Sequence, residues 1–293
     1  MPEGTGAKDT WTPLKIIQWA VPYLTQKGIS NPRMDVELIL AHALQLDRLK
    51  VYLQFDRPLD AGELAAIREL LKRRAQREPL QYLLGQREFF GLNFKVGPAV
   101  LIPRPETELL VEGVLKHLEK FPQENRLVLD LGTGSGCIAI AVAKNISCRV
   151  WAVDKSERAL ETAKLNGQNL GVEPPIEWRQ GDWFTALRPE DPLQFAVIVS
   201  NPPYIPMEEK AELSPEVRDY EPSEALFAEK MGLKAYEDIA AGLKERLLEG
   251  GGAFLEIHAN GFDKVSGVMA PLGLKETLER DLQGHPRLIK LEK

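Results

Sequence analysis

The chain has 293 residues, of which 44% are hydrophobic and 27% are charged, and its formal net charge is −6. These values are typical of a soluble protein with one large and one small domain, and they argue against broad binding to phosphate backbones. No apolar run approaches the roughly 20 residues that cross a bilayer. The first dozen residues lack the basic-then-apolar order of a signal peptide. Two cysteines and four histidines without zinc-type spacing predict a metal-free protein of a reducing compartment.

From Thr10 to about Glu78 the apolar residues recur at helical spacing, which predicts a series of helices. Asp60 with Glu63 predicts a capping box that opens one of these helices. A basic run follows, which consists of Lys72, Arg73, Arg74 and Arg77. We interpret it as a solvated helix face, and the alternative is a contact with a protein substrate or with ribosomal RNA.

Pro79 ends the helical pattern, and the segment from Phe89 to Val96, with Gly91 inside it, predicts a β-hairpin. A helix beginning near Pro105 is expected to cover the sheet that follows. We therefore predict three parts: a helical domain over 1–84, a hairpin linker over 85–104 and an α/β domain over 105–293.

A short apolar run, Leu127 to Leu131, leads directly into a glycine turn, and a helix-like stretch begins at Cys137, which we interpret as a packing residue. This order of strand, turn and helix is typical of nucleotide-type sites, because glycines permit a tight turn and close approach of a ligand. The spacing is not that of a dinucleotide fingerprint, and Asp130 just before the turn suits a ligand with an ammonium group. The turn consists of Gly132, Thr133, Gly134, Ser135 and Gly136.

Two further strands deliver polar residues to the same sheet edge. The strand from Arg149 to Val153 ends at Asp154, where a carboxylate can accept hydrogen bonds from ribose hydroxyls. The strand from Ile176 to Arg179 leads to Asp182 and Trp183. We expect Trp183 to pack on an adenine ring, with a core aromatic as the alternative.

The tetrapeptide Asn201-Pro202-Pro203-Tyr204 follows the apolar run from Phe195 to Ser200. The side-chain carbonyl of Asn201 and the stiffly held backbone carbonyl of Pro202 offer two fixed hydrogen-bond acceptors. Tyr204 supplies an aromatic plate for the bound group or a wall of the loop. Such a receptacle fits a planar group carrying an NH2, although Asn-Pro and Pro-Pro also mark ordinary turns.

Taken together, these residues predict methyl transfer from S-adenosylmethionine to an amide or exocyclic amine nitrogen. This cofactor carries an ammonium group for Asp130, a ribose diol for Asp154 and an adenine ring for Trp183. One alternative is methylation of a base amine in nucleic acid, which presents the same NH2 geometry. Another is a nicotinamide-dependent oxidoreductase or nucleotide-binding module, against which Asp130 and the glycine spacing count.

After the tetrapeptide we expect a long irregular stretch from Ile205 to Met231, which is either a binding lid or a stiff surface excursion. Strands over Gly252–His258, Leu274–Leu278 and Leu288–Leu291 then complete a doubly wound, Rossmann-like sheet. The predicted class is α/β.

The chain resembles the bacterial peptide-chain-release-factor glutamine N(5)-methyltransferases over nearly all of residues 79 to 293. The segments that carry this resemblance are Arg87–Leu92, Leu101–Glu108, Asp130–Gly136, Asp182–Phe184, Ser200–Tyr204 and Glu221–Leu226. It implies an S-adenosylmethionine-dependent methyltransferase fold with an antiparallel last strand, and a class I release factor as substrate, modified on the glutamine of its Gly-Gly-Gln motif. His258 and Gly261 depart from the Gly and Gln usual in the family.

The residues and the resemblance together give the predicted site. Catalysis is assigned to Asn201, Pro202 and Tyr204, and these bind the substrate amide together with Pro203. Cofactor binding is assigned to Asp130, Gly132, Thr133, Gly134, Ser135, Gly136, Asp154, Asp182, Trp183 and Asn201. No residue is an obvious general base, and Arg104 is either a cofactor-side or a structural residue.

We expect a cytoplasmic monomer without membrane contact and without sequence-specific binding to nucleic acid. The helical N-terminal domain is the expected place for recognition of the release factor.

Overall fold

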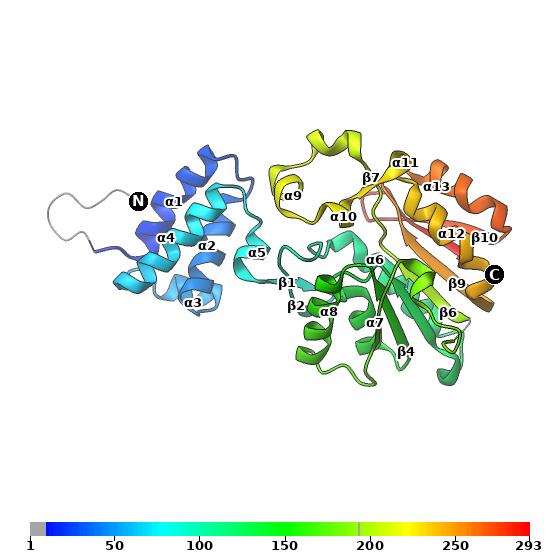
Figure 1. Cartoon of the computed structure of the whole chain (residues 1–293). Helices are drawn as coiled ribbons and strands as arrows, with labels where there is room; N and C mark the ends of the chain where they lie inside the picture. The colour runs from blue at the N-terminus through cyan, green and yellow to red at the C-terminus, as the bar shows by residue number, and fades with distance from the viewer. Residues whose placement is uncertain (1–9, 193) are drawn as a thin grey trace. The chain divides into compact units, whose positions relative to one another are not determined.

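The computed structural model describes residues 10–192 and 194–293 and divides them into two units (Figure 1). The first unit contains the described residues up to Gly85 together with Ser214–Tyr220, and the second contains Gln86–Leu213 and Glu221–Lys293. Most of the segment considered for a signal peptide, and the start of the predicted helical domain, lie outside the described residues.

The first unit is helical. A hydrophobic core that includes Ile16, Leu24, Ile39 and Ile67 holds its helices together. The predicted capping box is confirmed, because Asp60 accepts from the Glu63 amide at 2.8 Å and the Glu63 carboxylate accepts from the Asp60 amide at 3.0 Å. The helices are α1 (Pro13–Gln26), α2 (Pro32–Ala43), α3 (Arg48–Leu53), α4 (Ala61–Ala75), α5 (Leu80–Leu84) and α9 (Pro215–Tyr220).

The basic run on α4 is not a solvated face throughout, so that interpretation is wrong for Arg74. Arg74 is only 6% exposed, and its guanidinium donates to Asp35 at 2.6 Å and to Glu216 of α9 at 3.1 Å. Arg77 donates to the other oxygen of Glu216 at 2.6 Å. These ion pairs attach α9 to the helical unit, although the chain on both sides of α9 belongs to the second unit.

The predicted hairpin is present at the start of the second unit as β1 (Gln86–Phe89) and β2 (Leu92–Lys95), which pair antiparallel. Its two turn residues, Phe90 and Gly91, have φ of 51° and 71°. Positive φ at both positions is characteristic of the two-residue hairpin turn whose twist matches the flanking strands.

A seven-stranded sheet is the centre of the second unit, with the order β10-β11-β9-β6-β3-β4-β5. The pairs from β9 to β5 are parallel, whereas β11 runs antiparallel to both of its neighbours. This arrangement confirms the predicted doubly wound fold and its antiparallel last strand. The strands are β3 (Leu127–Leu131), β4 (Arg149–Asp154), β5 (Glu177–Gln180), β6 (Phe195–Ser200), β9 (Leu247–Glu256), β10 (Lys275–Arg280) and β11 (Pro286–Glu292).

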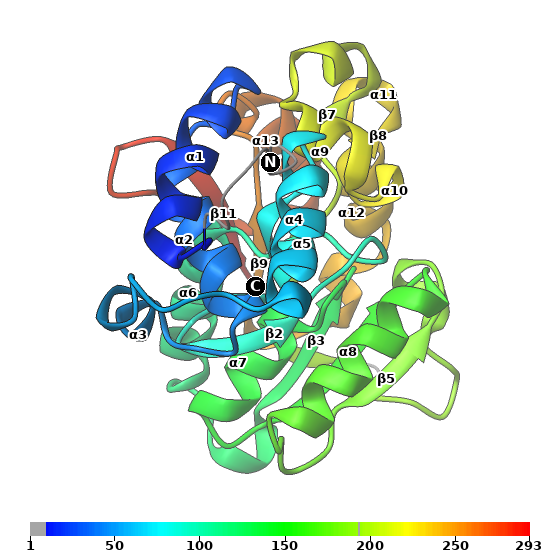
Figure 2. The same cartoon turned by 90° about the vertical axis from the view of Figure 1, so that its left-hand side faces the viewer.

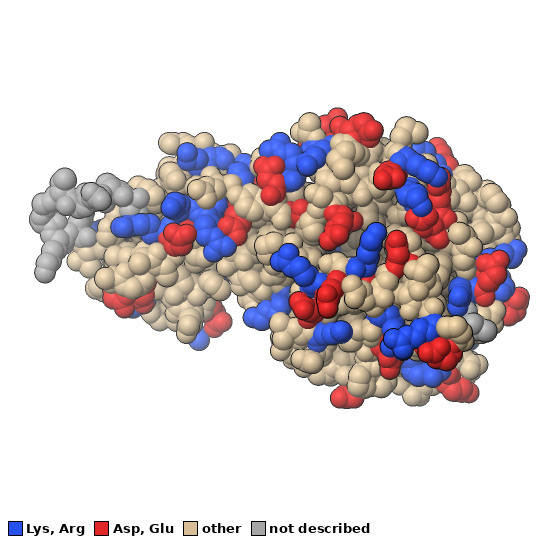
Figure 3. All heavy atoms as spheres, in the orientation of Figure 1, with Lys and Arg blue, Asp and Glu red and all other residues tan. Residues whose placement is uncertain are grey.

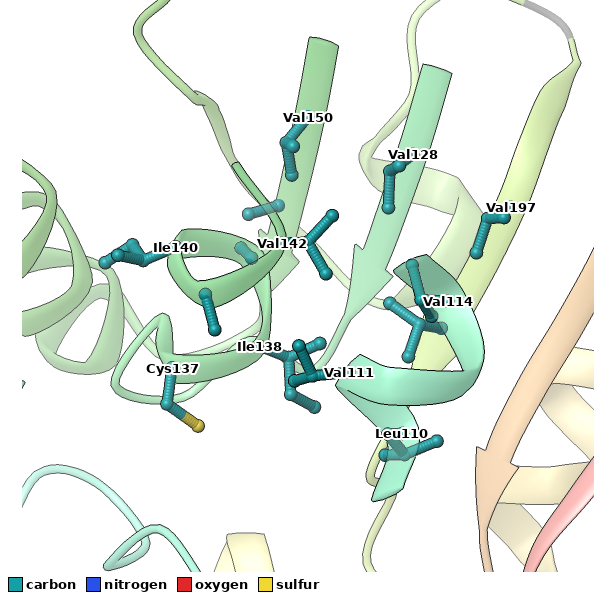
Figure 4. Close-up of a cluster of buried hydrophobic side chains, with 14 of the residues drawn as sticks. Leu110, Val111, Val114, Val128, Cys137, Ile138, Ile140, Val142, Val150 and Val197 are labelled. Carbon is teal, nitrogen blue, oxygen red and sulfur yellow. The ribbon is translucent and has the colours of Figure 1, made fainter. Parts of the chain in front are cut away.

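Helices cover both faces of the sheet (Figure 2). On one face, Val128, Val150 and Val197 of the strands point towards Ile138 of α7 and Val114 of α6 (Figure 4). Residues of α12 and α13 form a second hydrophobic cluster on the other face. The longer helices are α6 (Glu108–Leu118), α7 (Cys137–Asn145), α8 (Glu157–Asn169), α12 (Lys234–Arg246) and α13 (Phe262–Met269), and the short 3-10 helices are η1 (Pro105–Thr107), η2 (Gln123–Asn125), η3 (Trp183–Ala186) and η5 (Ala270–Leu272).

The stretch from Ile205 to Met231 is not irregular, so that prediction is wrong. Two short parallel strands, β7 (Ile205–Pro206) and β8 (Phe227–Ala228), pair at its base. Between and after them lie η4 (Met207–Glu212), α9, α10 (Ser223–Leu226) and α11 (Glu229–Gly232). The excursion is therefore closed by backbone pairing close to the Asn-Pro-Pro-Tyr tetrapeptide.

Acidic and basic side chains are intermixed on the face drawn in Figure 3, which agrees with the modest net charge of −6. Among the described residues, no helix has both the length and the apolar character that a membrane span requires.

Candidate active site

The glycine turn lies between β3 and α7, and three of its residues have left-handed backbones. Gly132, Gly134 and Gly136 have φ of 73°, 56° and 80°, which side-chain-bearing residues rarely adopt. A Cβ on Gly136 would lie 3.1 Å from the Ala163 side chain, so this glycine permits close packing of α8. A Cβ on Gly134 would meet nothing within 4 Å, so the backbone there is open to a ligand.

Asp154 at the end of β4 is tied to this turn. Its Oδ2 accepts from the Gly134 amide at 2.7 Å and its Oδ1 accepts from the Ser156 amide at 2.9 Å. Burial raises the pKa of this carboxyl, while the backbone N–H groups oppose the rise. Each oxygen keeps a further lone pair, so the carboxylate can also accept hydrogen bonds from a ligand.

Asp130 lies beneath the turn and is completely buried. Its Oδ2 accepts from the Thr133 hydroxyl at 2.7 Å, and its Oδ1 accepts no hydrogen bond of good geometry within the described chain. Burial raises its pKa to about 7. The Thr133 hydroxyl and the Ala139 amide oppose this rise, and the negative charge of Asp154 adds to it. An acidic group with an unpaired oxygen favours a cationic or N–H-bearing ligand nearby.

A cavity of about 460 Å³ opens above these residues within the second unit. Of the predicted site residues, its lining includes Gly132, Thr133, Gly134, Ser135, Asp154, Asp182, Trp183, Asn201 and Pro203. Asp130, Gly136, Pro202 and Tyr204 are not among the lining residues, although Thr133, whose hydroxyl donates to Asp130, is. The structure thus brings the ends of β3, β4, β5 and β6 to one cavity, as the topology of an open parallel sheet predicts.

Trp183 holds an unusual backbone conformation at the rim, with φ of 48°. A Cβ on Gly132 would be 3.7 Å from the indole ring, so the ring lies over the start of the glycine turn. Asp182 is half-exposed, with its carboxylate 3.6 Å from the Lys155 ammonium. A left-handed tryptophan costs of order 1–3 kcal/mol, and such strain is typical of binding positions.

Asn201 lines the cavity, whereas the Tyr204 ring packs into the hydrophobic cluster of α12 and β9 and lies 6.0 Å from the ring of His258. Burial raises the pKa of the Tyr204 phenol, so it stays neutral. One of the two departures from the family pattern, His258, is therefore a neighbour of Tyr204.

Sequence reasoning missed several residues of the site. Thr107 and Glu224 line the cavity. Arg104, which the sequence predicts to be either a cofactor-side or a structural residue, also lines it and donates to the buried Glu221 at 2.6 Å. Glu221 also accepts from the Ile102 amide at 3.1 Å. The signal that could have found them is their place in the segments 101–108 and 221–226, which carry the family resemblance.

Cys137 has a packing role, as predicted. Its side chain is buried, and burial raises the pKa of its thiol to about 12, which leaves it unreactive.

We expect the Asp130→Asn variant to become more stable relative to the wild type as the pH increases from about 4 to about 7. The quantity compared is the free energy of unfolding of the two proteins. The folded wild type holds the Asp130 proton up to pH about 7, whereas an unfolded aspartate loses it near pH 4. The folded state therefore binds more protons in this window, and the stability of the wild type falls with rising pH by at most about 1.4 kcal/mol per pH unit.

Urea unfolding of both proteins at several pH values measures this difference. His117 and Glu256 also titrate with shifted pKa values, but they do so in both proteins and cancel. A stability difference that stays constant across the window would contradict the buried, proton-binding state of Asp130.

Comparison with known protein families agrees with this architecture. The family described as "PrmC N-terminal domain" matches residues 15–85, and "Methyltransferase small domain" matches residues 106–215. A solved structure of the N-terminal domain of human METTL16 in complex with SAH has a TM-score of 0.51 and 20% identity, covering 75% of this chain and 82% of that one. At this identity the likeness shows a common fold.

Curated relatives are more similar. A release factor glutamine methyltransferase of Geobacter sulfurreducens is 42% identical over 92% of this chain and 92% of its own length. A protein of the same name from Rhodopirellula baltica is 37% identical over 97% of both chains. Identity at this level across both units means that the chain belongs to the release factor glutamine methyltransferase family.

Proposed function

We propose that this protein transfers a methyl group from S-adenosylmethionine to the side-chain amide nitrogen of the glutamine in the Gly-Gly-Gln motif of class I release factors. Family membership supports this reaction. The observation that carries the proposal is the position of Asn201 on the wall of the cavity that the glycine turn and Asp154 also line.

The residues of the cavity fit the proposed cofactor. Asp154 offers acceptors for ribose hydroxyls, and Trp183 offers a face for adenine. Asp130 does not line the cavity, and burial raises its pKa to about 7, so an ammonium group bound beside the glycine turn would favour its ionised form. When bound, S-adenosylmethionine supplies an electrophilic methyl group, and the nitrogen that receives it then gives up a proton to water. The exposed backbone of Gly134 gives the ligand room for close approach.

The chain's own contribution to catalysis is to position the substrate. An amide nitrogen is a poor nucleophile because its lone pair is delocalised into the carbonyl. Asn201 Oδ1 and the carbonyl of Pro202 each accept one N–H, which fixes the nitrogen and favours its departure from planarity. Pro203 stiffens the loop that holds these acceptors, and the neutral Tyr204 anchors the end of the loop by packing into the hydrophobic cluster of α12 and β9.

The proposal assigns different roles to the predicted parts of the chain. The helical domain over 1–84 binds the body of the release factor, the hairpin over 85–104 is a linker, and the domain over 105–293 carries out methyl transfer. The cytoplasmic location, the monomeric state and the absence of sequence-specific nucleic acid binding stay predictions.

The test is transfer of tritium from labelled S-adenosylmethionine to a panel of acceptors. The panel contains an unmethylated release factor, the same factor with the Gly-Gly-Gln glutamine replaced by alanine, ribosomal RNA and DNA. We expect label only in the first. Label in RNA or DNA would transfer the proposal to a base amine, and label in the alanine variant would place the modification elsewhere in the release factor.

Replacing Asp154 by Asn is expected to raise the dissociation constant for S-adenosylmethionine by on the order of 10-fold or more, because hydrogen bonds to a charged group contribute about 1.5–3 kcal/mol. The change removes the charge and one acceptor that hold both the Gly134 amide and the ligand. Calorimetric titration measures the effect.

The matched control is Glu157→Gln, which removes an exposed carboxylate a few residues further along the chain. It should bind the cofactor like the wild type. Equal affinities for the Asp154→Asn variant and this control would contradict the role of Asp154.

A further inference from the structure

Three side chains from distant parts of the sequence form a hydrogen-bonded chain behind the amide of Asn201. The Thr107 hydroxyl donates to Glu256 Oε2 at 2.7 Å, and Asn201 Nδ2 donates to Thr107 Oγ1 at 3.3 Å. Thr107 comes from η1 and Glu256 from the end of β9, and they are only 2% and 4% exposed. The whole chain of contacts lies within the second unit.

The chemistry of these groups dictates the direction of the bonds. An ionised carboxylate only accepts hydrogen bonds, and a hydroxyl has a single hydrogen to donate. Once the hydroxyl of Thr107 donates to Glu256, its oxygen can only accept from Asn201. The NH2 end of the Asn201 amide is therefore held towards Thr107, and its oxygen is turned away from it.

We propose that Thr107 and Glu256 are positioning residues that hold the Asn201 amide with its oxygen presented to the N–H of the substrate. This inference rests on the proposed function, because it explains how the acceptor of that reaction is oriented. In the opposite orientation Asn201 would present an NH2 group to the NH2 of the substrate, and two donors cannot bond. The hydrogen-bonded chain of Glu256, Thr107 and Asn201, which we call the relay, thus selects one of two amide orientations that differ little in shape.

Protonation of Glu256 would weaken this selection. Burial raises the pKa of Glu256 to about 7, with Glu106 raising it and Thr107, Arg287 and Arg104 lowering it. Among the described residues, the Tyr204 phenol, the Cys137 thiol and the Tyr236 hydroxyl also interact with Glu256, and the Tyr236 hydroxyl donates to its backbone carbonyl. A protonated carboxyl can donate to Thr107, which frees the threonine hydrogen to point at Asn201 and favours the unproductive orientation.

The test compares three variants of the full chain with the wild type, using unmethylated release factor and saturating S-adenosylmethionine. Thr107→Val keeps the shape but removes the hydroxyl, and we expect kcat to fall about tenfold, as loss of one oriented hydrogen bond implies. Thr107→Ser restores the hydroxyl and should recover most of kcat. In the wild type, kcat should fall as the pH drops below about 7, and Glu256→Gln should flatten this limb.

Three results would overturn the inference: wild-type kcat in Thr107→Val, equal losses in the valine and serine variants, or an acid limb that persists in Glu256→Gln. Cofactor affinity and the thermal unfolding midpoint are recorded for every variant, and the pH profile of Glu256→Gln decides the question if Thr107→Val does not fold. Failure of the proposed function itself has a different signature, since the wild type would then leave the release factor unmethylated. Loss of activity in Asn201→Ala with full activity in Thr107→Val would reject only the relay.

Discussion

Asn201→Ala is expected to lower kcat for release factor methylation by on the order of 100-fold or more, because it removes a preorganised hydrogen-bond acceptor at the reacting nitrogen. The side chain lines the cavity, and its Nδ2 donates to Thr107. Because Asn201 is also assigned to cofactor binding, the dissociation constant for S-adenosylmethionine should rise, but by much less than kcat falls. Single-turnover kinetics with saturating cofactor, together with calorimetric binding, separates the two effects.

The matched control is Asn145→Ala. Asn145 ends α7, is exposed, and its side chain donates only to the Ala141 carbonyl, so this variant should keep full activity. Equal activities for the two variants would contradict the role of Asn201. A large loss of cofactor affinity in Asn201→Ala would instead assign the residue to cofactor binding.

Gly232→Ala is expected to reduce both stability and activity strongly. Gly232 has φ of +86°, and a Cβ there would lie 2.3 Å from the backbone carbonyl oxygen of Tyr204. Backbone atoms cannot swing aside as a side chain can, so the tetrapeptide loop must move by a substantial fraction of an ångström. Misplacement of about 1 Å can cost on the order of 100-fold in rate.

Gly284→Ala is the matched control. It distinguishes the effect of the clash with the Tyr204 carbonyl from the free-energy cost of an alanine in the left-handed conformation. Gly284 has nearly the same φ, +85°, but a Cβ there would meet nothing within 4 Å. This control should lose about 1–2 kcal/mol of stability and keep its kcat, since a left-handed alanine has that intrinsic cost. Similar kcat values for the two variants, measured at a temperature where both are folded, would contradict the close packing of Gly232 against Tyr204.

Local signals in the sequence were sufficient to predict the centre of the fold. The apolar run from Phe195 to Ser200 is the strand β6 with the predicted bounds, and the capping box at Asp60 opens α4. Continuous apolar runs bounded by glycine or proline leave few alternatives to a buried strand. The positions of Asp154 and Asn201 followed from them, because parallel strands end at a common edge.

Contacts between residues far apart in the sequence could not be predicted in this way. Arg74 is buried because Asp35 and Glu216 neutralise it, and these partners lie 39 and 142 residues away. Glu256 and Thr107 are separated by 149 residues, and nothing in the local pattern of either one indicates the bond. From sequence alone, a charged residue is predicted to be exposed, because its burial depends on an oppositely charged partner that the local sequence does not reveal.

The other errors of the sequence-based prediction arose where residues adopt backbone conformations that their residue type disfavours. Lys230 and Met231 both have positive φ, of 54° and 55°, and they help to close the excursion that seemed irregular from the sequence. Left-handed conformations of such residues are stabilised by tertiary contacts rather than by local propensity. The pairing of β7 with β8 is likewise only two residues long and leaves no periodic signal.

Tandem mass spectrometry of the release factor after incubation with S-adenosylmethionine tests the central claim most directly, with the wild type and Asn201→Ala run side by side. The proposal predicts that the wild type adds the mass of one CH2 unit to the glutamine of the Gly-Gly-Gln peptide, and that this gain is lost or greatly slowed in the variant. An unmodified glutamine after incubation with the wild type, or equal modification by both proteins, would contradict it.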